Sequence, residues 1–146
     1  LPTRKRSAIT PELYLGGQYK LNSLNHLKKL GVTGIVNMRT RSIHTIAPEG
    51  IKVLHLPTPD HHAPTLGDLS KGVVFIKHEV EAGGKVYIHC RFGEGRGPTM
   101  AIAYLISTGL TLEHAIELVK KVRIFIRPTV VQIEQLKKFE TLQAKE

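Results

Sequence analysis

Residues 86–99 read Val-Tyr-Ile-His-Cys-Arg-Phe-Gly-Glu-Gly-Arg-Gly-Pro-Thr, and the rest of the chain is organised around this stretch. The apolar run at 86–88 predicts a buried strand, and the apolar run at 100–106 predicts a buried helix. The loop between them starts at Cys90 and ends at Arg96. Its glycines allow successive N–H groups to point at one spot, and the helix N-terminus adds positive charge. The loop is therefore predicted to bind a tetrahedral oxyanion.

Two side chains of this loop carry chemistry. The guanidinium of Arg96 can hold an anion with two parallel hydrogen bonds. The same positive field favours the thiolate of Cys90, which is the nucleophilic form of the side chain. A buried cysteine beside a tight turn is the simpler interpretation, but it leaves His89, the loop glycines and the arginine unexplained. The residues expected to contact the anion between Cys90 and Arg96 are Arg91, Phe92, Gly93, Glu94 and Gly95.

The pattern His-Cys-x5-Arg, formed by His89, Cys90 and Arg96, resembles the signature of the cysteine-dependent protein tyrosine phosphatases. The short chain around it most resembles the dual-specificity branch of that superfamily. The resemblance covers roughly residues 9–140. It includes three flanking segments, which are 9–17, 31–39 and the pair Arg127-Pro128.

Composition and periodicity predict one globular domain. The 146 residues are 41% hydrophobic and 23% charged, as in soluble proteins that bury their own core. We expect a basic tail at 1–8 and a single catalytic domain at 9–146. Strands alternating with helices, then a run of helices, predict an α/β fold with a central mixed, mostly parallel sheet flanked by helices. The expected strands are at 13–15, 32–38, 51–56 and 86–88, and the expected helices are near 21–30, 65–82, 98–107, 112–122 and 130–143.

The net charge of +9 favours acidic partners, such as a phosphorylated protein, a small phosphate ester or a nucleic acid. The eight aromatic residues form no stacking pattern for nucleobases, so nucleic acid is not the expected partner. No apolar run approaches the roughly 20 residues of a membrane span, and no signal-peptide pattern opens the chain. A single cysteine excludes an internal disulfide and fits a reducing compartment. We therefore expect a cytoplasmic location.

Release of an ester oxygen requires a proton, so an acid is expected near the loop. The chain has only two aspartates. Asp68 forms a helix-capping pattern with Thr65, which leaves Asp60 on a proline-bracketed loop. Its position resembles that of the family's general-acid aspartate, although an aspartate beside a proline is also common in turns. Glu94 is the alternative acid, and we expect it to face solvent or an arginine instead.

The resemblance implies a mechanism in two steps. The thiolate of Cys90 attacks phosphorus while Arg96 and the loop N–H groups hold the other oxygens, and Asp60 protonates the leaving group. Water then hydrolyses the cysteinyl-phosphate, with Asp60 acting as the base. No metal or other cofactor is expected. His89 is expected to support the loop through hydrogen bonds and to tune Cys90.

The chain departs from the family pattern at Gly97. The family usually has Ser or Thr directly after the signature arginine, and that hydroxyl stabilises the departing thiolate when the intermediate breaks down. Thr99 is the nearest hydroxyl that could replace it in this chain. The departure bears on the rate of the second step and leaves the first step unchanged.

Histidines raise the question of a metal site. The four candidates have a spacing that matches none of the usual zinc patterns, and a catalytic loop already explains the polar residues there. We therefore expect no metal ion. These candidates are His55, His61, His62 and His89.

The residues leave several functions open. The first is a protein phosphatase for phosphotyrosine, with phosphoserine and phosphothreonine as further substrates. The second is a phosphatase for lipid, nucleotide or RNA 5′-phosphates, and acidic Glu94 beside basic Arg91 argues against a polyanionic substrate. A non-catalytic phosphate-binding module would not need Cys90, and a sulfur-transfer enzyme would not need Asp60.

Overall fold

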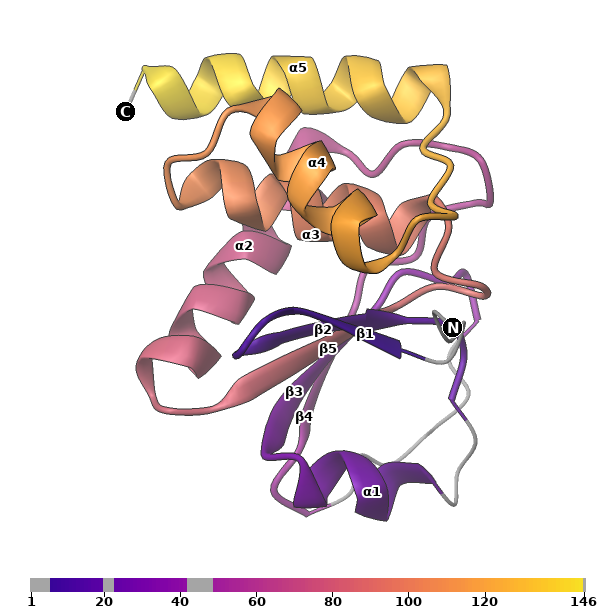
Figure 1. The fold of residues 1–146 in the computed structure, drawn as a ribbon, viewed down its shortest axis with the longest axis vertical. Coiled ribbons are helices and arrows are strands. Elements are labelled where there is room, and N and C mark those ends of the chain that lie inside the picture. Colours follow the sequence, from indigo (N-terminus) through magenta and orange to yellow (C-terminus); the bar gives the residue numbers. More distant parts are fainter. Residues whose placement is uncertain (1–5, 20–22, 42–48, 146) are drawn as a thin grey trace.

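A five-stranded sheet forms the centre of the molecule (Figure 1). The computed structural model describes residues 6–19, 23–41 and 49–145. The strand order is β1-β2-β5-β3-β4, with β1 antiparallel to β2 and every other neighbouring pair parallel. This confirms the expected mixed, mostly parallel sheet. The strands are β1 (Arg6–Thr10), β2 (Leu13–Gly16), β3 (Val32–Asn37), β4 (Lys52–His55) and β5 (Lys85–His89).

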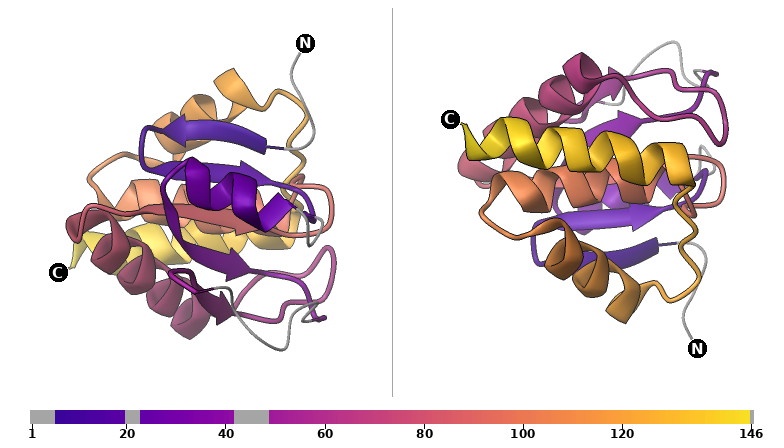
Figure 2. Two further views of the ribbon diagram at one scale, coloured as in Figure 1. Left: turned by 90° about the horizontal axis from the view of Figure 1, so that it is seen from below. Right: turned by 90° about the horizontal axis from the view of Figure 1, so that it is seen from above.

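Helices cover the two faces of the sheet unequally (Figures 1 and 2). The short helix α1 lies on one face, whereas α2, α3 and α4 pack on the other. Helix α5 lies outside α3 and packs mainly on α3, with smaller contacts to α2 and α4, so this side has two helical layers. The helices are α1 (Leu24–Lys29), α2 (Leu66–Glu81), α3 (Arg96–Ser107), α4 (Leu112–Val122) and α5 (Val130–Ala144).

Threonine caps define where three of these helices begin. The hydroxyl of Thr65 accepts the N–H of Asp68 at 3.0 Å, as the capping pattern predicted. Thr111 caps α4 in the same way, and Thr129 forms a complete capping box at the start of α5. Gly31 follows the C-cap residue of α1, and it has a φ of 92°, which an L residue rarely adopts. The predicted helix start at Leu21 lies outside the described residues.

Two predicted boundaries are wrong. The basic tail predicted at 1–8 extends too far, because residues 6–8 form the first part of β1. Ser7 and Ile9 are buried on one side of this edge strand, and two inward side chains are too short a pattern to detect in a sequence. Helix α3 begins at Arg96 and not at residue 98, so the arginine belongs to its first turn.

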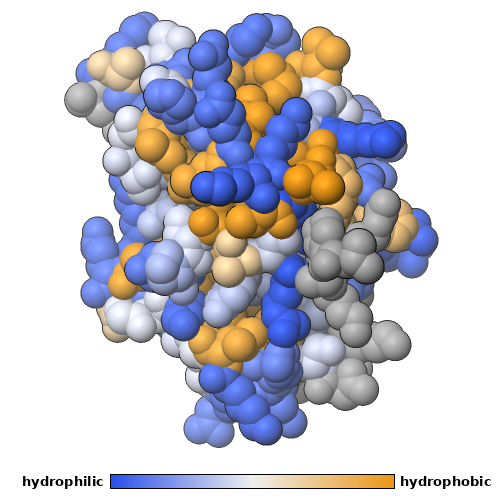
Figure 3. All heavy atoms as spheres, viewed as in Figure 1, coloured by the Kyte–Doolittle hydropathy of each residue, from blue (hydrophilic) through white to orange (hydrophobic). Residues whose placement is uncertain are grey.

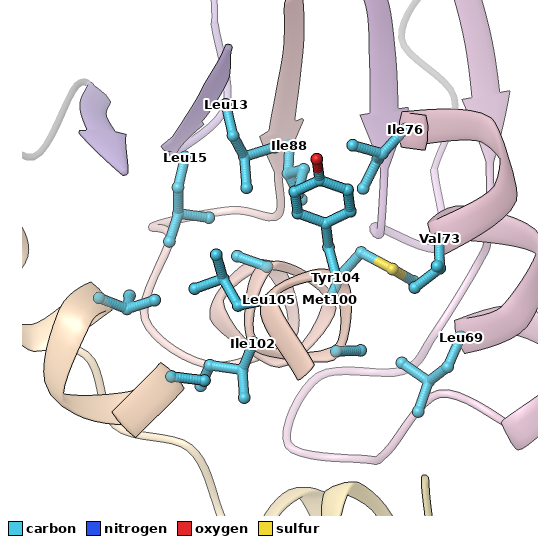
Figure 4. Packing of buried hydrophobic residues seen from close by; sticks show 14 of the residues in the cluster. Leu13, Leu15, Leu69, Val73, Ile76, Ile88, Met100, Ile102, Tyr104 and Leu105 are labelled. Carbon is cyan, nitrogen blue, oxygen red and sulfur yellow. The ribbon is translucent and has the colours of Figure 1, made fainter. Parts of the chain in front are cut away.

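Helix α3 is the centre of the main hydrophobic core, with its residues 96–106 all buried. Figure 4 shows its side chains between leucines of β2, an isoleucine of β5 and an apolar stripe of α2. Gly72 allows α2 to approach closely, because a Cβ there would lie 2.4 Å from the sulfur of Met100. The expected burial of the segment after the loop is therefore confirmed.

The surface of the helical layer keeps some apolar side chains exposed, and Figure 3 shows them among charged residues over this part of the molecule. None of the helices in the described part of the chain combines the length and the apolar character that crossing a bilayer requires. The exposed apolar residues of α4, α5 and their connection are Val122, Ile124, Val130, Val131 and Leu142.

Candidate active site

The carboxyl ends of three parallel strands meet at His89. The sheet register pairs Gly16 of β2 and Asn37 of β3 with this residue. Beyond the paired residues, the N–H of Gln18 donates to the carbonyl of Arg91 at 2.8 Å. The loop that starts at Cys90 therefore emerges where the ends of β2 and β3 flank it on both sides.

The loop is held from behind by Arg123, the residue after α4. Its side chain is fully buried, and it donates to the carbonyls of Gly93 and Phe92, both at 2.9 Å. A third N–H lies 3.2 Å from the hydroxyl of Ser7. Gly93 has a φ of 69°, and a Cβ there would lie 2.4 Å from the Arg123 guanidinium. The carbonyls of Phe92 and Gly93 point toward Arg123. The N–H groups of the loop can therefore face the side of the loop that lies away from Arg123.

Arg96 is placed at the first turn of α3 and is only 5% exposed. One of its terminal N–H groups donates to the carbonyl of Thr58 at 2.8 Å. Its Nε is a buried donor with no hydrogen-bond acceptor among the described residues. Buried donors normally have an acceptor, and an oxygen of a bound oxyanion would satisfy this one.

Asp60 lies next to this clamp. Its carboxylate is 3.6 Å from Nε of Arg96, and its side chain is 61% exposed. The neighbouring His61 has a φ of 68°, which is unusual for a residue with a Cβ. The structure therefore brings together the predicted acid and the predicted anion clamp, which are 36 positions apart in the chain.

The N-terminal turns of α5 hold the loop that carries Asp60. The hydroxyl of Thr129 donates to the carbonyl of His61 at 3.0 Å, and the amide of Gln132 donates to the carbonyl of His62 at 2.9 Å. Gln135 adds a bond of 2.8 Å to the carbonyl of Pro64. Three side chains at the start of α5 therefore hold the loop of Asp60 against this helix.

These segments enclose a cavity of about 430 Å³. Three of the predicted site residues lie behind the wall of this cavity and do not line it. They are His89, Gly93 and Thr99. The contact of Gly93 with an anion through its N–H group stays a prediction. The lining residues are Asp60, His61, Cys90, Arg91, Phe92, Glu94, Gly95, Arg96, Arg127, Thr129 and Gln132.

His89 supports the loop from the core. Its side chain is fully buried, stacks on Tyr87 and meets the edge of Tyr19. Its Nδ1 lies 3.3 Å from the carbonyl oxygen of Cys90. Burial raises the pKa of Tyr19 to about 12 and places that of Tyr87 higher still, so both phenols stay neutral at physiological pH.

Positions 97 and 99 follow Arg96, and they differ in what a hydroxyl there can contact. At Gly97 an added Cβ would lie 3.5 Å from the sulfur of Cys90, which makes this the position from which a hydroxyl could reach the sulfur. Thr99 is fully buried, and its hydroxyl donates to the carbonyl of Gly95 at 2.7 Å. Thr99 therefore braces the end of the loop, and its proton is directed away from Cys90.

No three of the candidate histidines form one cluster in the described part of the chain. His55 contacts the carbonyl of Arg39, and His89 lies in the core. Within residues 6–19, 23–41 and 49–145, no three His, Cys, Asp or Glu side chains are grouped as metal ligands.

Sequence reasoning missed Arg123, Gln132 and Arg39. Gln132 could have been found, because Thr-x-x-Gln is a capping-box pattern. Arg123 carries a weaker signal as a lone charge within the apolar stretch 122–126. Arg39 has no local signal, because only the sheet register brings the end of β3 beside Cys90.

Comparison with known proteins agrees with this geometry. The family model described as "Dual specificity phosphatase, catalytic domain" matches residues 13–142. Human dual specificity protein phosphatase 1 is 32% identical over 136 residues, which are 91% of this chain and 36% of that protein. The chain thus spans about a third of the length of this relative.

Solved structures resemble it over nearly their whole length. A crystal structure of PTPMT1 in complex with PI(5)P superposes with a TM-score of 0.87 at 30% identity, covering 94% of this chain and 95% of that one. Human DUSP28 gives a TM-score of 0.88 at 27% identity, covering 99% and 97%. The strand order, the loop between β5 and α3 and these matches lead to one conclusion: the chain belongs to the dual specificity phosphatase catalytic domain family, within the protein tyrosine phosphatase superfamily.

Proposed function

We propose that this chain is a cysteine-dependent phosphatase that hydrolyses phosphotyrosine, and also phosphoserine and phosphothreonine, in proteins. The single observation that carries the proposal is the buried Nε of Arg96, which has no hydrogen-bond acceptor among the described residues, lies 3.6 Å from the Asp60 carboxylate and faces the cavity that Cys90 also lines. A nucleophile, an anion clamp and an acid line one cavity, and this is the set that phosphate-ester hydrolysis needs.

The chemistry follows from these positions. The thiolate of Cys90 attacks phosphorus in line, forming the S–P bond as the ester P–O bond breaks. Arg96 and the loop N–H groups hold the non-bridging oxygens, and Asp60 gives its proton to the leaving oxygen. Water then attacks the cysteinyl-phosphate, Asp60 takes a proton from it, and inorganic phosphate leaves as the thiolate returns.

The thiolate must stay reduced for this cycle, and a cytoplasmic location suits that requirement. A phosphorylated protein is the partner that the proposal requires, and none of its steps needs a metal or an organic cofactor.

Phosphate esters of lipids are a second candidate substrate class. The observation that favours them is the number of arginines near the cavity, since Arg39, Arg91 and Arg127 add to the signature arginine. This charge weighs against the expectation drawn from Glu94. The 30% identity to PTPMT1, solved with PI(5)P, also supports this class.

A substrate panel tests the proposal. Phosphate release is measured as kcat/KM for phosphotyrosine, phosphoserine and phosphothreonine peptides, phosphoinositides, and nucleotides. We expect release from the peptides, and the variant Cys90→Ser should lose more than about 99% of it while still binding inorganic phosphate. Sulfur transfer from thiosulfate to cyanide without phosphate release would overturn the proposal, and so would full activity of Cys90→Ser.

A further inference from the structure

Three arginines outside the signature arginine lie around the mouth of the loop. Arg91 directly follows Cys90, and Arg39 and Arg41 follow the end of β3. The parallel register of β3 and β5 pairs Asn37 with His89, so the residues after both strands leave the sheet side by side. Residues about fifty positions apart in the chain are therefore neighbours at this edge.

The turn after β3 is held in one conformation. Asn37 is only 4% exposed, and its side chain accepts the N–H of Arg39 at 2.8 Å and donates to the carbonyl of Arg41 at 2.9 Å. The ring of His55 contacts the carbonyl of Arg39 at 2.5 Å. A buried amide and a histidine thus fix the backbone that presents the two arginines.

The side chain of Arg39 is directed toward the loop of Cys90. Its guanidinium donates to the side-chain oxygen of Gln18 at 2.6 Å, and the N–H of Gln18 donates to the carbonyl of Arg91 at 2.8 Å. Gly17 packs against the same carbonyl, where a Cβ would lie 2.8 Å away. The residues after β2 therefore connect Arg39 to the first residue of the loop.

The guanidinium groups of these arginines are close enough for their positive charges to repel one another. Burial, followed by the guanidinium groups of Arg91, Arg96 and Arg41, lowers the pKa of Arg39, and the sulfur of Cys90 opposes this effect. The salt bridges between described residues include none with Arg39, Arg41 or Arg91. Like charges that are held together by such contacts, and that have no carboxylate partner among the described residues, attract an anion.

We propose that Arg39, Arg41 and Arg91 form a second anion subsite that binds a second phosphate group of the substrate, beside the phosphate that is hydrolysed. Arg96 is committed to the first phosphate, so these arginines are available to another. A planar guanidinium group can donate two parallel hydrogen bonds to two oxygens of a phosphate. A phosphate dianion also offsets more of the repulsion between the guanidinium groups than a singly charged carboxylate does. The inference rests on the proposed phosphatase chemistry and narrows its substrate to molecules that carry a second phosphate group close to the one that is hydrolysed.

The experiment compares esters that differ only in the second anion. Its substrates are phenyl phosphate, carboxyphenyl phosphate, and the bisphosphates of catechol, resorcinol and hydroquinone, with kcat/KM expressed per ester group. A charge-assisted hydrogen bond to phosphate predicts that at least one bisphosphate is favoured over phenyl phosphate by about tenfold or more. The three ring positions report the spacing between the two phosphates.

Variants then locate the effect. Arg39→Gln should reduce this preference to about one, and Arg39→Lys should keep only part of it, because a point charge lacks the planar fork. Lys120→Gln removes an equal charge from the exposed face of α4 and should leave the preference unchanged. The preference is a ratio, so a general loss of activity in a variant does not alter it.

The outcomes separate the two proposals. Release from phenyl phosphate with no bisphosphate preference overturns the second subsite and leaves the phosphatase intact, whereas release from no ester at all overturns the phosphatase itself. An equal preference for carboxyphenyl phosphate, or for acid-flanked monophosphorylated peptides, also overturns the subsite as a phosphate site. Inositol bisphosphate in solution and the same headgroup in phosphatidylcholine vesicles distinguish a free substrate from a lipid-borne one.

Discussion

Cδ1 of Leu15 lies against Gly97, only 2.8 Å from where a Cβ at position 97 would be. The same Cβ would lie 3.5 Å from the sulfur of Cys90. Leu15 is fully buried in the core beside α3 (Figure 4), so it can move little. The absence of a hydroxyl next to Cys90 is therefore coupled to a leucine of β2, more than eighty positions away in the chain.

Restoring the hydroxyl requires both positions to change. We expect Gly97→Ser alone to lower the melting temperature, because the new side chain overlaps Leu15. In Leu15→Ala/Gly97→Ser the hydroxyl has room to donate to the thiolate as the intermediate breaks down. A hydrogen bond to a charged atom contributes about 1.5–3 kcal/mol, so this step should become about tenfold faster or more.

The single variant Leu15→Ala is the matched control, because it carries the same cavity without the hydroxyl. Pre-steady-state release of phenol and phosphate measures the two steps separately. We expect a burst of phenol in the wild type that shrinks in the double variant. Equal breakdown rates in the double variant and in Leu15→Ala would contradict this role of position 97.

Asp60→Asn tests the general acid. The amide keeps the size of the side chain and removes the proton that the leaving oxygen needs. General acid catalysis contributes about a hundred- to ten-thousand-fold, and most for poor leaving groups. We therefore expect a severe loss with alkyl and phenyl phosphates and a small one with nitrophenyl phosphate.

Asp68→Asn is the control for this substitution, since Asp68 lies in the first turn of α2 away from the cavity. It should alter only stability, by about 0.3–1 kcal/mol through the lost charge at the helix N-terminus. A loss in Asp60→Asn that is uniform across leaving groups would exclude Asp60 as the acid. Glu94, which also lines the cavity, would then be the next residue to replace.

Arg123→Met should weaken both the fold and anion binding. The substitution leaves the carbonyls of Phe92 and Gly93 buried without their donors, and each unsatisfied group costs about 1–3 kcal/mol. Urea denaturation should therefore show a lower free energy of unfolding, and the affinity for inorganic phosphate should fall as the loop relaxes. Lys121→Met, an exposed change near the end of α4, should change stability by less than about 0.5 kcal/mol. Reduced stability with unchanged phosphate affinity would limit Arg123 to a packing role.

Glu79 makes the stability of the fold depend on pH. This side chain of α2 is 5% exposed. Burial alone would raise its pKa, but hydrogen bonds from His78, Lys52 and Thr33 outweigh burial and lower the pKa below its ordinary value of 4.5. Because the pKa is lower in the folded state, the stabilisation is complete above about pH 4.5 and is lost as the pH falls through the folded value.

Glu79→Gln should therefore lower the free energy of unfolding at pH 7 by about 1–3 kcal/mol, as expected for lost hydrogen bonds to a charged group. The difference from the wild type should shrink below pH 4.5. Glu81→Gln, at an exposed position of the same helix, is the control and should show neither effect. A difference that stays constant from pH 7 to pH 4 would exclude the ionised carboxylate as the cause.

The sequence by itself determined the local elements, and it predicted the chemistry that we propose for the main loop. Periodicity predicted α4 and α5 within a residue or two, because this signal acts within one or two turns. Cys90 and Arg96 could be assigned from spacing, since one loop carries both. Asp60 could be assigned by elimination, since the chain has only one other aspartate.

Tertiary structure alone decided which distant residues complete the site. Ser7 and Arg123 meet across 116 positions, and the amide of Gln132 reaches the loop of Asp60 across 70. Arg39 lies at the site only because the register of β3 and β5 aligns their ends. Contacts of this kind depend on how strands pair and helices pack, and no local pattern encodes them. The packing of Leu15 over Gly97 could not be predicted for the same reason. Leu15 lies in β2 and Gly97 in α3, no local sequence pattern links the two residues, and only the packing of the core brings them together.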